Sequence, residues 1–381
     1  MASRRLQAVA LVLAFGAGAL AGWGWRGASP GAGGGTLAAV AGLVRQRYLR
    51  PVPPGLLREG ALRGMVAALG DPYSAYLSPG EWAAFQAVAQ GEFVGVGVTL
   101  GPAPGGTAVV DVLSGSPAAR AGLAPGAEIL AVDGREAAGR PPAQVALWLR
   151  GRAGSRVWLT VRQAGKVRSV ALRRAALTLP TVRARMLAGG IGYLRIYRFG
   201  AGTRAAAARA LAALRRGGMR ALVLDLRDDP GGLMSQAVAV ARLLVRAGPV
   251  AAVQDRSGHR VVYTAPGPGL GLPAAVLIDR GTASAAELLA GAIRDRHAGI
   301  LIGGRTYGKG VVQQLFALPE GGALKLTVAR YLTPNGTDLN GRGLAPQLVV
   351  PEPAGVLPGD DPARDPQLAR AWAWLRGRRG R

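Results

Sequence analysis

The 381-residue sequence contains no cysteine, only two histidines (His259 and His297) and only three lysines among its 47 basic residues. Without cysteine the chain has no disulfide, no thiol nucleophile and no thiolate metal site. Two histidines are too few for a histidine-rich metal centre. We therefore expect no metal and no organic cofactor.

The charge balance is strongly one-sided, with a net charge of +26 carried almost entirely by arginine. Such a balance can favour nucleic acid or anionic lipid. The arginines are scattered, however, and no recognisable nucleic-acid module accompanies them. We expect no nucleic-acid partner, and only a weak attraction to lipid headgroups. Apolar residues make up 49% of the chain, which indicates a folded core.

Charge is also missing from Leu6 to Trp25, a run of twenty residues that follows Arg4 and Arg5. That length can cross a bilayer, and the preceding arginines favour a cytoplasmic amino terminus. A cleaved signal peptide is the alternative, because Ala19-Leu20-Ala21 is an acceptable cleavage site. Both alternatives predict export to the periplasm or cell envelope, with the anchor holding the protein at the inner membrane.

The stretch Gly281–Leu288 carries the first sign of chemistry. It lies between the apolar run Ala274–Ile278, which predicts a buried strand, and Ala285–Ile293, which predicts a helix. A hydroxyl at Ser284 would lie beside unpaired N–H groups of the helix terminus, a plausible place for a nucleophile. The alternative is a capping box, because Glu287 follows three residues later.

Lys309, flanked by Gly308 and Gly310, is the second sign. Arginine cannot act as a base near neutral pH, whereas a desolvated lysine can. One of only three lysines in a glycine-lined position is therefore informative. Gln313 follows four residues later, and its amide is expected to orient the amine of Lys309.

These residues together resemble the C-terminal processing peptidases, also called tail-specific proteases. The resemblance runs over roughly residues 38–351 and includes the family's Thr/Ser-Ala-Ser-Ala-Ser/Ala-Glu motif. It implies Ser284 as nucleophile, Lys309 as base 25 residues downstream, and Gln313 as the glutamine that follows. It also implies a serine endopeptidase with a Ser-Lys dyad, which cleaves protein substrates near their C-termini.

Residues from Glu92 to about Ala171 indicate a PDZ-like module. Phe93–Leu100 begins with glycines and is expected to continue as a strand, so that Gly95, Val96, Gly97 and Val98 would bind the C-terminal tail of a peptide. Two later segments, Ser116–Leu123 and Gly126–Gly134, resemble bacterial PDZ domains. The groove helix is expected at Pro142–Leu149, and Val145–Leu149 would complete an apolar pocket.

After Thr178 the predicted strands, among them Ile191–Ile196 and Ala221–Arg227, alternate with predicted helices, which indicates α/β layering. Arg227–Gly232 resembles the family's Arg-Asn-x-Pro-Gly-Gly loop, with aspartates at the amide positions. The resemblance implies that the N–H groups of Gly231 and Ala285 form an oxyanion hole; the alternative is a Pro-Gly turn that caps the next helix. Tyr331–Gly336 resembles the family's Tyr-x-Thr-Pro-x-Gly segment. Gln347 replaces the final aspartate of the family's Gly-x-Gly-Ile-x-Pro-Asp segment.

The expected fold is a mixed α/β serine protease core with an inserted PDZ-like β-rich domain and an N-terminal helical segment. The domain boundaries are expected at a signal segment 1–25, a linker 26–36, a helical region 37–91, the PDZ-like domain 92–175, the core 176–352 and a basic tail 353–381. Within the helical region, Thr36–Tyr48 and Pro54–Leu69 show the spacing of apolar residues that predicts helices. The segment that follows, Gly70–Glu81, resembles the family's Asp-Pro-Tyr/His-Ser-x-Tyr-Leu segment. The sequence leaves a homo-oligomer or an activating partner open.

Parts of the sequence also suggest three other functions. A nucleotide enzyme would use Gly303–Lys309 as a phosphate loop, but Gly310 stands where a Ser or Thr must hold magnesium. A Ser-His-Asp protease lacks a suitable histidine, because His297 is expected at the far end of the helix that begins after Ser284, and His259 in a polar stretch. A non-catalytic, membrane-anchored PDZ adaptor would leave Lys309 and Gln313 without a role.

Overall fold

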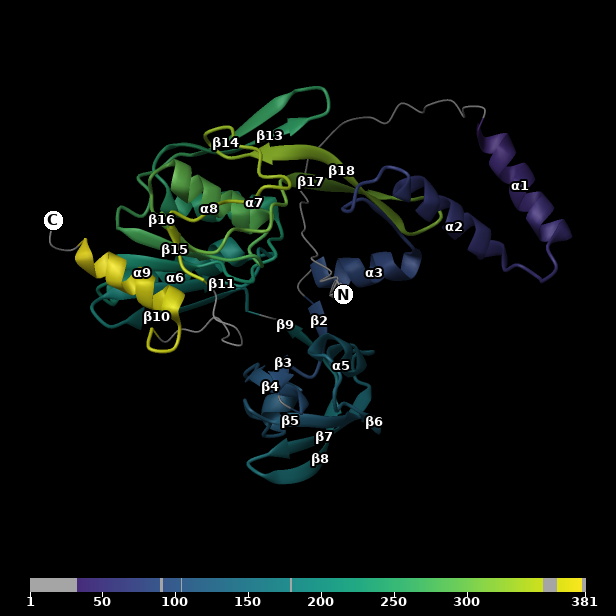
Figure 1. Ribbon diagram of the computed structural model, residues 1–381, viewed down its shortest axis with the longest axis horizontal. Helices are drawn as coiled ribbons and strands as arrows, with labels where there is room; N and C mark the ends of the chain where they lie inside the picture. The colour runs from purple at the N-terminus through teal and green to yellow at the C-terminus, as the bar shows by residue number, and fades with distance from the viewer. Residues whose placement is uncertain (1–32, 90–91, 104, 179, 352–361, 379–381) are drawn as a thin grey trace, which may run out of the picture. The chain divides into compact units, whose positions relative to one another are not determined.

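The computed structural model describes residues 33–89, 92–103, 105–178, 180–351 and 362–378 (Figure 1). The chain divides into two compact units. The first unit comprises Met1–Ala83 and Thr181–Arg381, and the second comprises Ala84–Pro180. The second unit is therefore an insertion in the sequence of the first.

A six-stranded sheet forms the centre of the first unit, in the order β10-β11-β12-β15-β16-β19. Strand β10 is antiparallel to β11, and all the other neighbours are parallel. The strands are β10 (Val182–Leu187), β11 (Ile191–Ile196), β12 (Ala221–Asp225), β15 (Ala274–Ile278), β16 (Ile300–Gly303) and β19 (Leu348–Val349). Parallel order places the carboxyl ends of β12, β15 and β16 at one edge of the sheet, from which the loops to Gly231, Ser284 and Lys309 begin.

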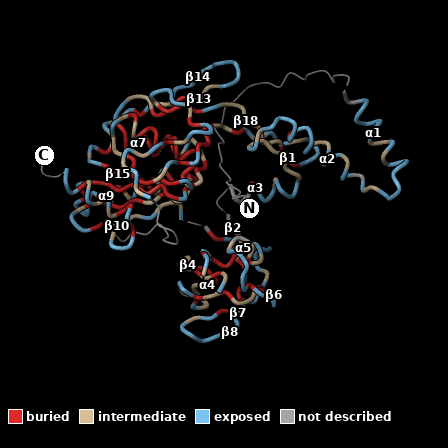
Figure 2. The backbone as a smooth tube through the Cα atoms, viewed as in Figure 1, coloured by how far each residue is buried: buried red, intermediate tan, exposed pale blue. Residues whose placement is uncertain are grey.

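Helices cover both faces of this sheet, which explains why its central strands are largely apolar. One face packs against α6 (Thr203–Arg216), α7 (Met234–Leu244) and α8 (Ala285–Asp295), and the other against α9 (Pro366–Gly377). Figure 2 shows the buried residues gathered in this sheet and its helices. The predicted strands Ile191–Ile196 and Ala274–Ile278 are confirmed. Strand β12 ends at Asp225, two residues before the predicted end, because Arg227 folds back to pair with Asp225.

A second sheet in the first unit has the order β1-β18-β13-β14, with β17 added on β18. Its strands are β1 (Ala75–Leu77), β13 (Gly248–Asp255), β14 (Arg260–Ala265), β17 (Val311–Ala317) and β18 (Ala323–Leu332). The hairpin of β13 and β14 was not predicted. Strand β1 belongs to the connector Gly70–Glu81, so this connector is joined to the core by backbone pairing with β18.

The N-terminal helices are α1 (Gly33–Arg47), α2 (Pro54–Ala67) and α3 (Pro79–Ala89), and the boundary between the two units at Ala84 falls within α3. The first two confirm the predicted helices at 36–48 and 54–69 to within three residues. The apolar segment Leu6–Trp25 lies outside the described residues. Among the residues that are described, no helix has both the length and the apolar character needed to cross a membrane.

The second unit holds a sheet in the order β3-β4-β5-β7-β8 with β6 on β5, and a separate pair of β2 and β9. The predicted strand Phe93–Leu100 is interrupted at Val96 and Gly97. Gly97 has φ +84°, and a Cβ there would lie 2.2 Å from the Cβ of Ser116, so the chain turns where only glycine fits. The elements are β2 (Glu92–Gly95), β3 (Val98–Ala103), β4 (Gly106–Val112), α4 (Pro117–Arg120), β5 (Glu128–Val132), β6 (Arg135–Glu136), α5 (Pro142–Leu149), β7 (Arg156–Gln163), β8 (Lys166–Arg173) and β9 (Ala175–Thr178).

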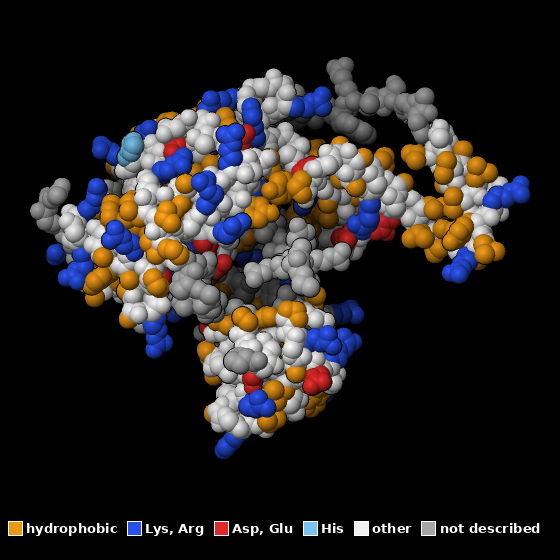
Figure 3. All heavy atoms as spheres, in the orientation of Figure 1, with side chains coloured by type: hydrophobic (Ala, Val, Ile, Leu, Met, Phe, Trp, Pro, Cys, Tyr) orange, Lys and Arg blue, Asp and Glu red, His pale blue; other side chains and the backbone are white. Residues whose placement is uncertain are grey.

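The basic side chains do not gather in one patch on the face shown in Figure 3. Lys and Arg side chains are dispersed there among apolar and uncharged groups. Scattered cations of this kind do not form the basic stripe that is typical of a nucleic-acid interface.

Candidate active site

Ser284 is the residue between β15 and α8, and its backbone is unusual. It has φ +55° and ψ −117°, a conformation that residues other than glycine rarely adopt. The capping box of Ser284 and Glu287 that the sequence predicted is present. Strain of this kind persists only where the surrounding structure holds it, and it is concentrated at functional sites. The side chain is 7% exposed, at the N-terminus of α8.

Glu287 has a larger role than the capping box. Its fully buried carboxylate accepts the backbone N–H groups of Ser284 and Lys309 on Oε2, both at 2.8 Å. On Oε1 it accepts the Thr306 hydroxyl at 2.5 Å and the Gly308 N–H at 2.8 Å. Burial raises the pKa of Glu287, and these four donors oppose that rise. One carboxylate therefore holds the loops of Ser284 and Lys309 together.

Tyr331 joins the same two residues on their other side. Its buried hydroxyl lies 2.8 Å from the carbonyl oxygen of Ser284 and within hydrogen-bonding distance of the carbonyl oxygen of Lys309. The N–H groups of Ser284 and Lys309 thus share Glu287, and their carbonyl groups share Tyr331. The sequence reasoning missed both roles, although Tyr331 opens the segment that resembles the family's Tyr-x-Thr-Pro-x-Gly.

Lys309 follows β16, and its side chain is enclosed, with 3% of the residue exposed. Its Nζ lies 5.2 Å from the centroid of the Tyr73 ring. Burial, and then the positive charge of Lys325, lower the pKa of Lys309 to about 8. Asp71 and Glu287 act in the opposite direction. At this pKa roughly a tenth of the amine is neutral at pH 7, far more than an exposed lysine would offer.

The connector before the insertion supplies Tyr73, and hydrogen bonds fix that connector to β18. Ser74 donates its hydroxyl to Asp71 at 2.5 Å and accepts the N–H of Thr327 at 3.0 Å. Burial alone would raise the pKa of Asp71, but the bonds from Ser74, Thr327 and Tyr73 hold it below its ordinary value. The resemblance of Gly70–Glu81 to a family segment was the only signal in the sequence, and it did not reveal contact with Lys309.

Gln313 lies on β17, is 5% exposed and lines a cavity of about 20 Å³ together with Ser284. Its Nε2 donates to the Thr327 hydroxyl at 3.4 Å, because β17 and β18 place the two residues opposite each other. Within the described residues no hydrogen bond joins Gln313 to Lys309. The predicted orienting bond is therefore not made in this structure, and the role of Gln313 stays a prediction.

Gly231 and Ala285, the expected oxyanion donors, lie next to each other. Gly231 has φ +92°, and a Cβ there would lie 2.8 Å from the nitrogen of Ala285. Ala285 is the first residue of α8, so its N–H has no partner within the helix. The N–H of Gly231, however, donates to Asp229 Oδ1 at 2.7 Å. The sequence reasoning did not anticipate this bond.

Asp229 and Arg227 determine the shape of the loop that carries Gly231. Asp229 is fully buried, and burial raises its pKa well above the ordinary value. Its Oδ2 has no hydrogen-bond partner in the described part of the chain. Arg227 forms buried ion pairs with Asp225 and with Asp365, each at 2.7 Å. The pair with Asp365 ties the start of this loop to the helix α9.

The two histidines lie away from Ser284. Helix α8 ends at Asp295, so His297 follows about 16 Å of helix after Ser284. His259 is exposed on the loop between β13 and β14, with 70% of its side chain accessible. Lys309 is followed by strand β17 and not by a phosphate-binding helix. These placements argue against the histidine-base and nucleotide alternatives. Among the described residues, no cluster of three or more His, Asp or Glu side chains could hold a metal ion.

In the second unit, the four predicted peptide-binding residues line a single cavity of about 170 Å³. Gly95, Val96, Gly97 and Val98 form one wall, and Pro142, Ala146 and Leu149 on α5 contribute to another. Val145, which was expected in this pocket, instead lies fully buried in the core of the unit. Strand β3 is the edge strand of its sheet, so in the described residues one of its sides is unpaired.

Comparison with known proteins supports this organisation. The model of peptidase family S41 matches residues 190–350, that of the PDZ domain matches 109–163, and that of the activating protease CtpB N-terminal domain matches 36–79.

Relatives and solved structures agree with the family models. A carboxyl-terminal-processing protease of Picosynechococcus sp. is 36% identical, over 82% of this chain and 78% of its own. The carboxy-terminal processing protease CtpB of Bacillus subtilis is 32% identical, over 84% of this chain and 69% of its own. Among solved structures, a photosystem II D1 C-terminal processing protease has a TM-score of 0.55 and 34% identity, covering 83% of this chain and 87% of its own.

Proposed function

The chain belongs to peptidase family S41 and is a serine-type peptidase of the carboxyl-terminal processing group, and we propose that Ser284 and Lys309 form its catalytic dyad. The observation that carries this proposal is the double bridge between the two residues. Glu287 accepts the N–H groups of both, and the Tyr331 hydroxyl contacts the carbonyl groups of both. The adaptor alternative is disfavoured, because the match to a peptidase family includes both residues.

In the proposed reaction, the Ser284 hydroxyl attacks the carbonyl carbon of the scissile peptide bond while the neutral Lys309 amine takes its proton. The protonated lysine then gives this proton to the leaving amine, and the acyl-enzyme forms. Water attacks the ester next, with Lys309 again as the base, and the carboxylic acid product leaves with Ser284 restored. The lowered pKa of Lys309 supports this role, since only the unprotonated amine can accept a proton.

The oxyanion that forms in each step would be bound by the N–H groups of Ala285 and Gly231. The close approach of Gly231 to Ala285 supports this assignment. Because the N–H of Gly231 donates to Asp229 in this structure, binding of the oxyanion requires that this bond lengthen or be shared. Gln313 would orient the Lys309 amine once the Thr327 contact, which is long at 3.4 Å, is released.

The PDZ domain would select substrates by their C-terminal tails. The turn at Gly95–Gly97 would offer N–H groups to the terminal carboxylate, and the open edge of β3 would pair with the extended tail. Leu100 and Leu149 would contact an apolar final side chain. The apolar lining of this cavity supports a preference for aliphatic tails.

The site of action would be outside the cytoplasm, with the apolar segment Leu6–Trp25 as anchor or signal. The N-terminal helices would contact a second copy of the chain or an activating partner. In support, α1 and α2 leave apolar side chains such as Leu37, Leu43 and Leu56 more than half exposed.

The test is digestion of a peptide with an apolar free C-terminus by the full chain. Wild type is expected to cleave it, and the variants Ser284→Ala and Lys309→Arg are expected to be inactive while still binding the peptide. Ser257→Ala, a serine exposed on the β13–β14 loop, is the matched control and should retain full activity. Substantial cleavage by Lys309→Arg would contradict the dyad, because a guanidinium cannot act as the base.

A further inference from the structure

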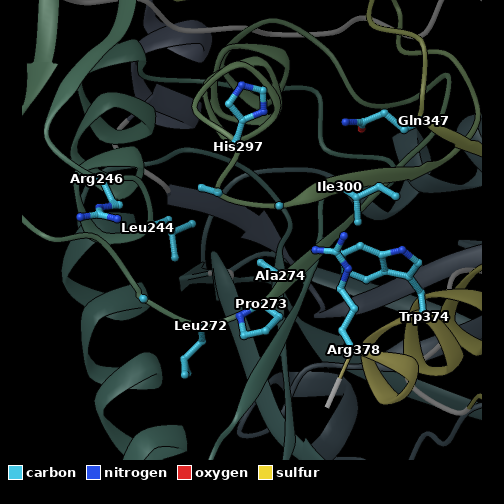
Figure 4. Close-up of a pocket in the computed structure, with 13 residues that line it drawn as sticks. Leu244, Arg246, Leu272, Pro273, Ala274, His297, Ile300, Gln347, Trp374 and Arg378 are labelled. Carbon is cyan, nitrogen blue, oxygen red and sulfur yellow. The ribbon is translucent and has the colours of Figure 1, made fainter. Parts of the chain in front are cut away.

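One cavity in the first unit lies away from Ser284 and Lys309. It has a volume of about 580 Å³ and includes the residues at which β15 and β16 begin, Ala274 and Ile300 (Figure 4). Ser284 and Lys309 follow the opposite ends of these two strands. A strand of five residues spans roughly 16 Å, so about the length of one strand separates the cavity from the proposed active site.

We call this the basic cavity, because its lining includes basic side chains and no acidic ones. Arg246, His297 and Arg378 contribute to it, and no Asp or Glu does. Among the described residues, neither Arg246 nor Arg378 has a carboxylate partner. Unpaired guanidinium groups that share a concave surface of one sign create a positive potential, which attracts anions.

Two contacts hold polar groups in place at the rim. The guanidinium carbon of Arg378 lies 4.6 Å from the ring centroid of Trp374, so the indole supports one face of the cation and its N–H edge stays available. Two hydrogen bonds fix Gln347 to β16. Its side-chain Oε1 accepts the Leu301 N–H at 2.6 Å, and its backbone N–H donates to the Leu301 carbonyl at 2.9 Å.

The fixed amide of Gln347 adds a donor to the cavity. Since its oxygen is occupied by Leu301, its Nε2 group remains to donate to a ligand. Figure 4 shows the nitrogen end of Gln347 directed to the side on which His297 lies. Arg378 and Gln347 thus offer hydrogen-bond donors on one side of the cavity, and Figure 4 shows Arg246 on the opposite side.

We propose that the basic cavity binds a phosphate-bearing organic anion. A phosphate group accepts several hydrogen bonds and arginine matches its geometry, so a guanidinium on either side of the cavity can bind it. The volume lies within the range of small-molecule sites and is far larger than a bare phosphate ion needs. Apolar lining from Leu244, Leu272 and Ile300 would contact the organic part of the ligand. The phosphate can belong to a soluble phosphomonoester or to the headgroup of an anionic phospholipid.

The proposal is tested with the full chain at low ionic strength. Calorimetric titration with glycerol 3-phosphate probes the soluble source, and flotation with phosphatidylglycerol vesicles against phosphatidylcholine vesicles probes the lipid source. The informative variants are Arg246→Gln combined with Arg378→Gln, and separately Gln347→Glu. The second retains an acceptor for Leu301 and places a negative charge in the lining. Arg256→Gln combined with Arg260→Gln, on the exposed β13–β14 hairpin, removes two charges elsewhere.

Wild type is expected to bind at least one of the two probes, and the affinity for that probe should fall at least tenfold in both cavity variants but not in the hairpin control. Binding of glycerol 3-phosphate with this pattern identifies a soluble ligand. A loss confined to phosphatidylglycerol vesicles identifies a lipid headgroup. The proposal is overturned if neither probe binds, if the cavity variants bind as wild type does, or if the hairpin control loses as much affinity as they do.

Discussion

The carboxylate of Glu287 accepts the backbone N–H of Lys309 at 2.8 Å, although 22 residues and the strand β16 separate them. The same oxygen accepts the N–H of Ser284, also at 2.8 Å. The backbone nitrogens of Ser284 and Lys309 therefore lie within about twice 2.8 Å of each other. Glu287 does not reach a substrate in this arrangement; it fixes the distance between the proposed nucleophile and its base.

The first prediction concerns this carboxylate. In Glu287→Gln one acceptor oxygen is replaced by an N–H₂ group, which would face donors instead of accepting from them. Hydrogen bonds to a charged group contribute about 1.5–3 kcal/mol each, so we expect kcat for peptide cleavage to fall about 10- to 100-fold. The measurement determines kcat and KM of Glu287→Gln and of wild type on one peptide substrate, and KM is expected to change little.

Glu136→Gln is the control for the Glu287 variant, because Glu136 is exposed in the second unit. It should retain wild-type kcat and thermal stability. The melting temperature of Glu287→Gln should fall as well, since a buried network loses its acceptor. Unchanged kcat together with an unchanged melting temperature would contradict the bridging role.

The second prediction concerns Lys325, whose positive charge helps to lower the pKa of Lys309. Lys325→Gln removes that charge, so the pKa of Lys309 should rise from about 8. A higher pKa leaves less neutral amine at pH 7, and a pKa raised by one would lower the rate there about tenfold. The expected result is a pH–rate profile for kcat/KM whose rising limb moves to higher pH, with the plateau rate little changed.

The matched control is Lys166→Gln, because Lys166 is the remaining lysine and is exposed at the start of β8. Its rising limb should coincide with that of wild type. If Lys325→Gln also leaves the limb in place, then either Lys309 is not the titrating base or Lys325 does not influence it. The activity of Lys309→Arg separates these two readings: retained cleavage indicates that Lys309 is not the base, and lost cleavage indicates that Lys325 does not influence it.

Much of the core could be predicted from the sequence because its strands are buried on both faces. Ala274–Ile278 and Ile191–Ile196 are apolar at nearly every position, and such runs are hard to place elsewhere. The hairpin of β13 and β14 was missed for the opposite reason. Strand β14 is an edge strand with mostly exposed residues, so no apolar pattern marks it.

Some residues of the proposed active site could be predicted from the sequence and others could not. Ser284 and Lys309 stand out in sequence because each has a local signature, a strand-to-helix turn and a rare lysine between glycines. The roles of Tyr73, Glu287 and Tyr331 depend on contacts between segments far apart in the chain, which local patterns do not encode. The bond from Gly231 to Asp229 depends on a positive φ that the Pro-Gly-Gly sequence permits but does not require.

The third prediction concerns the cavity between β3 and α5. A free terminal carboxylate forms stronger hydrogen bonds than an amide, so amidation of the substrate's C-terminus should weaken binding about tenfold or more. The measurement compares one peptide in both forms, by affinity and by cleavage rate.

A variant of the cavity tests the same prediction from the side of the protein. Leu100→Asp should weaken binding of an aliphatic tail, because Leu100 lines the cavity. Thr99→Asp, exposed on the same strand, is the control. Equal affinities and cleavage rates for the acid and amide peptides would mean that the PDZ domain does not recognise the terminal carboxylate.

The fourth prediction concerns Asp229, whose buried carboxyl group accepts the N–H of Gly231 and has an unpartnered Oδ2. Burial raises its pKa well above the ordinary value, the bond from Gly231 and the charge of Arg195 oppose the rise, and Asp279 adds to it. The acid form is therefore favoured over a wider pH range than in an exposed aspartate. Once ionised, Asp229 would bind the Gly231 N–H more strongly and place a negative charge beside the proposed oxyanion hole. Both effects oppose the transition state, so activity should decline as pH rises through this pKa.

Asp229→Asn tests this directly, because the amide keeps an acceptor for Gly231 but never ionises. We expect kcat within about threefold of wild type at pH 7, a difference below about 1 kcal/mol, and no decline on the alkaline side.

The raised pKa of Asp229 also makes the folding stability of the wild type depend on pH. The folded-state pKa of Asp229 lies above its unfolded value, so the native state holds a proton that the unfolded state releases, and wild type loses stability as pH rises between the two values. Asp229→Asn removes that loss, so its melting temperature should exceed that of wild type at pH 7 to 8, with the difference vanishing towards pH 4. Asp228→Asn is the control: Asp228 is the adjacent aspartate, but its side chain accepts no bond from Gly231. An alkaline decline that is the same in Asp229→Asn and wild type would show that a different group controls the oxyanion loop.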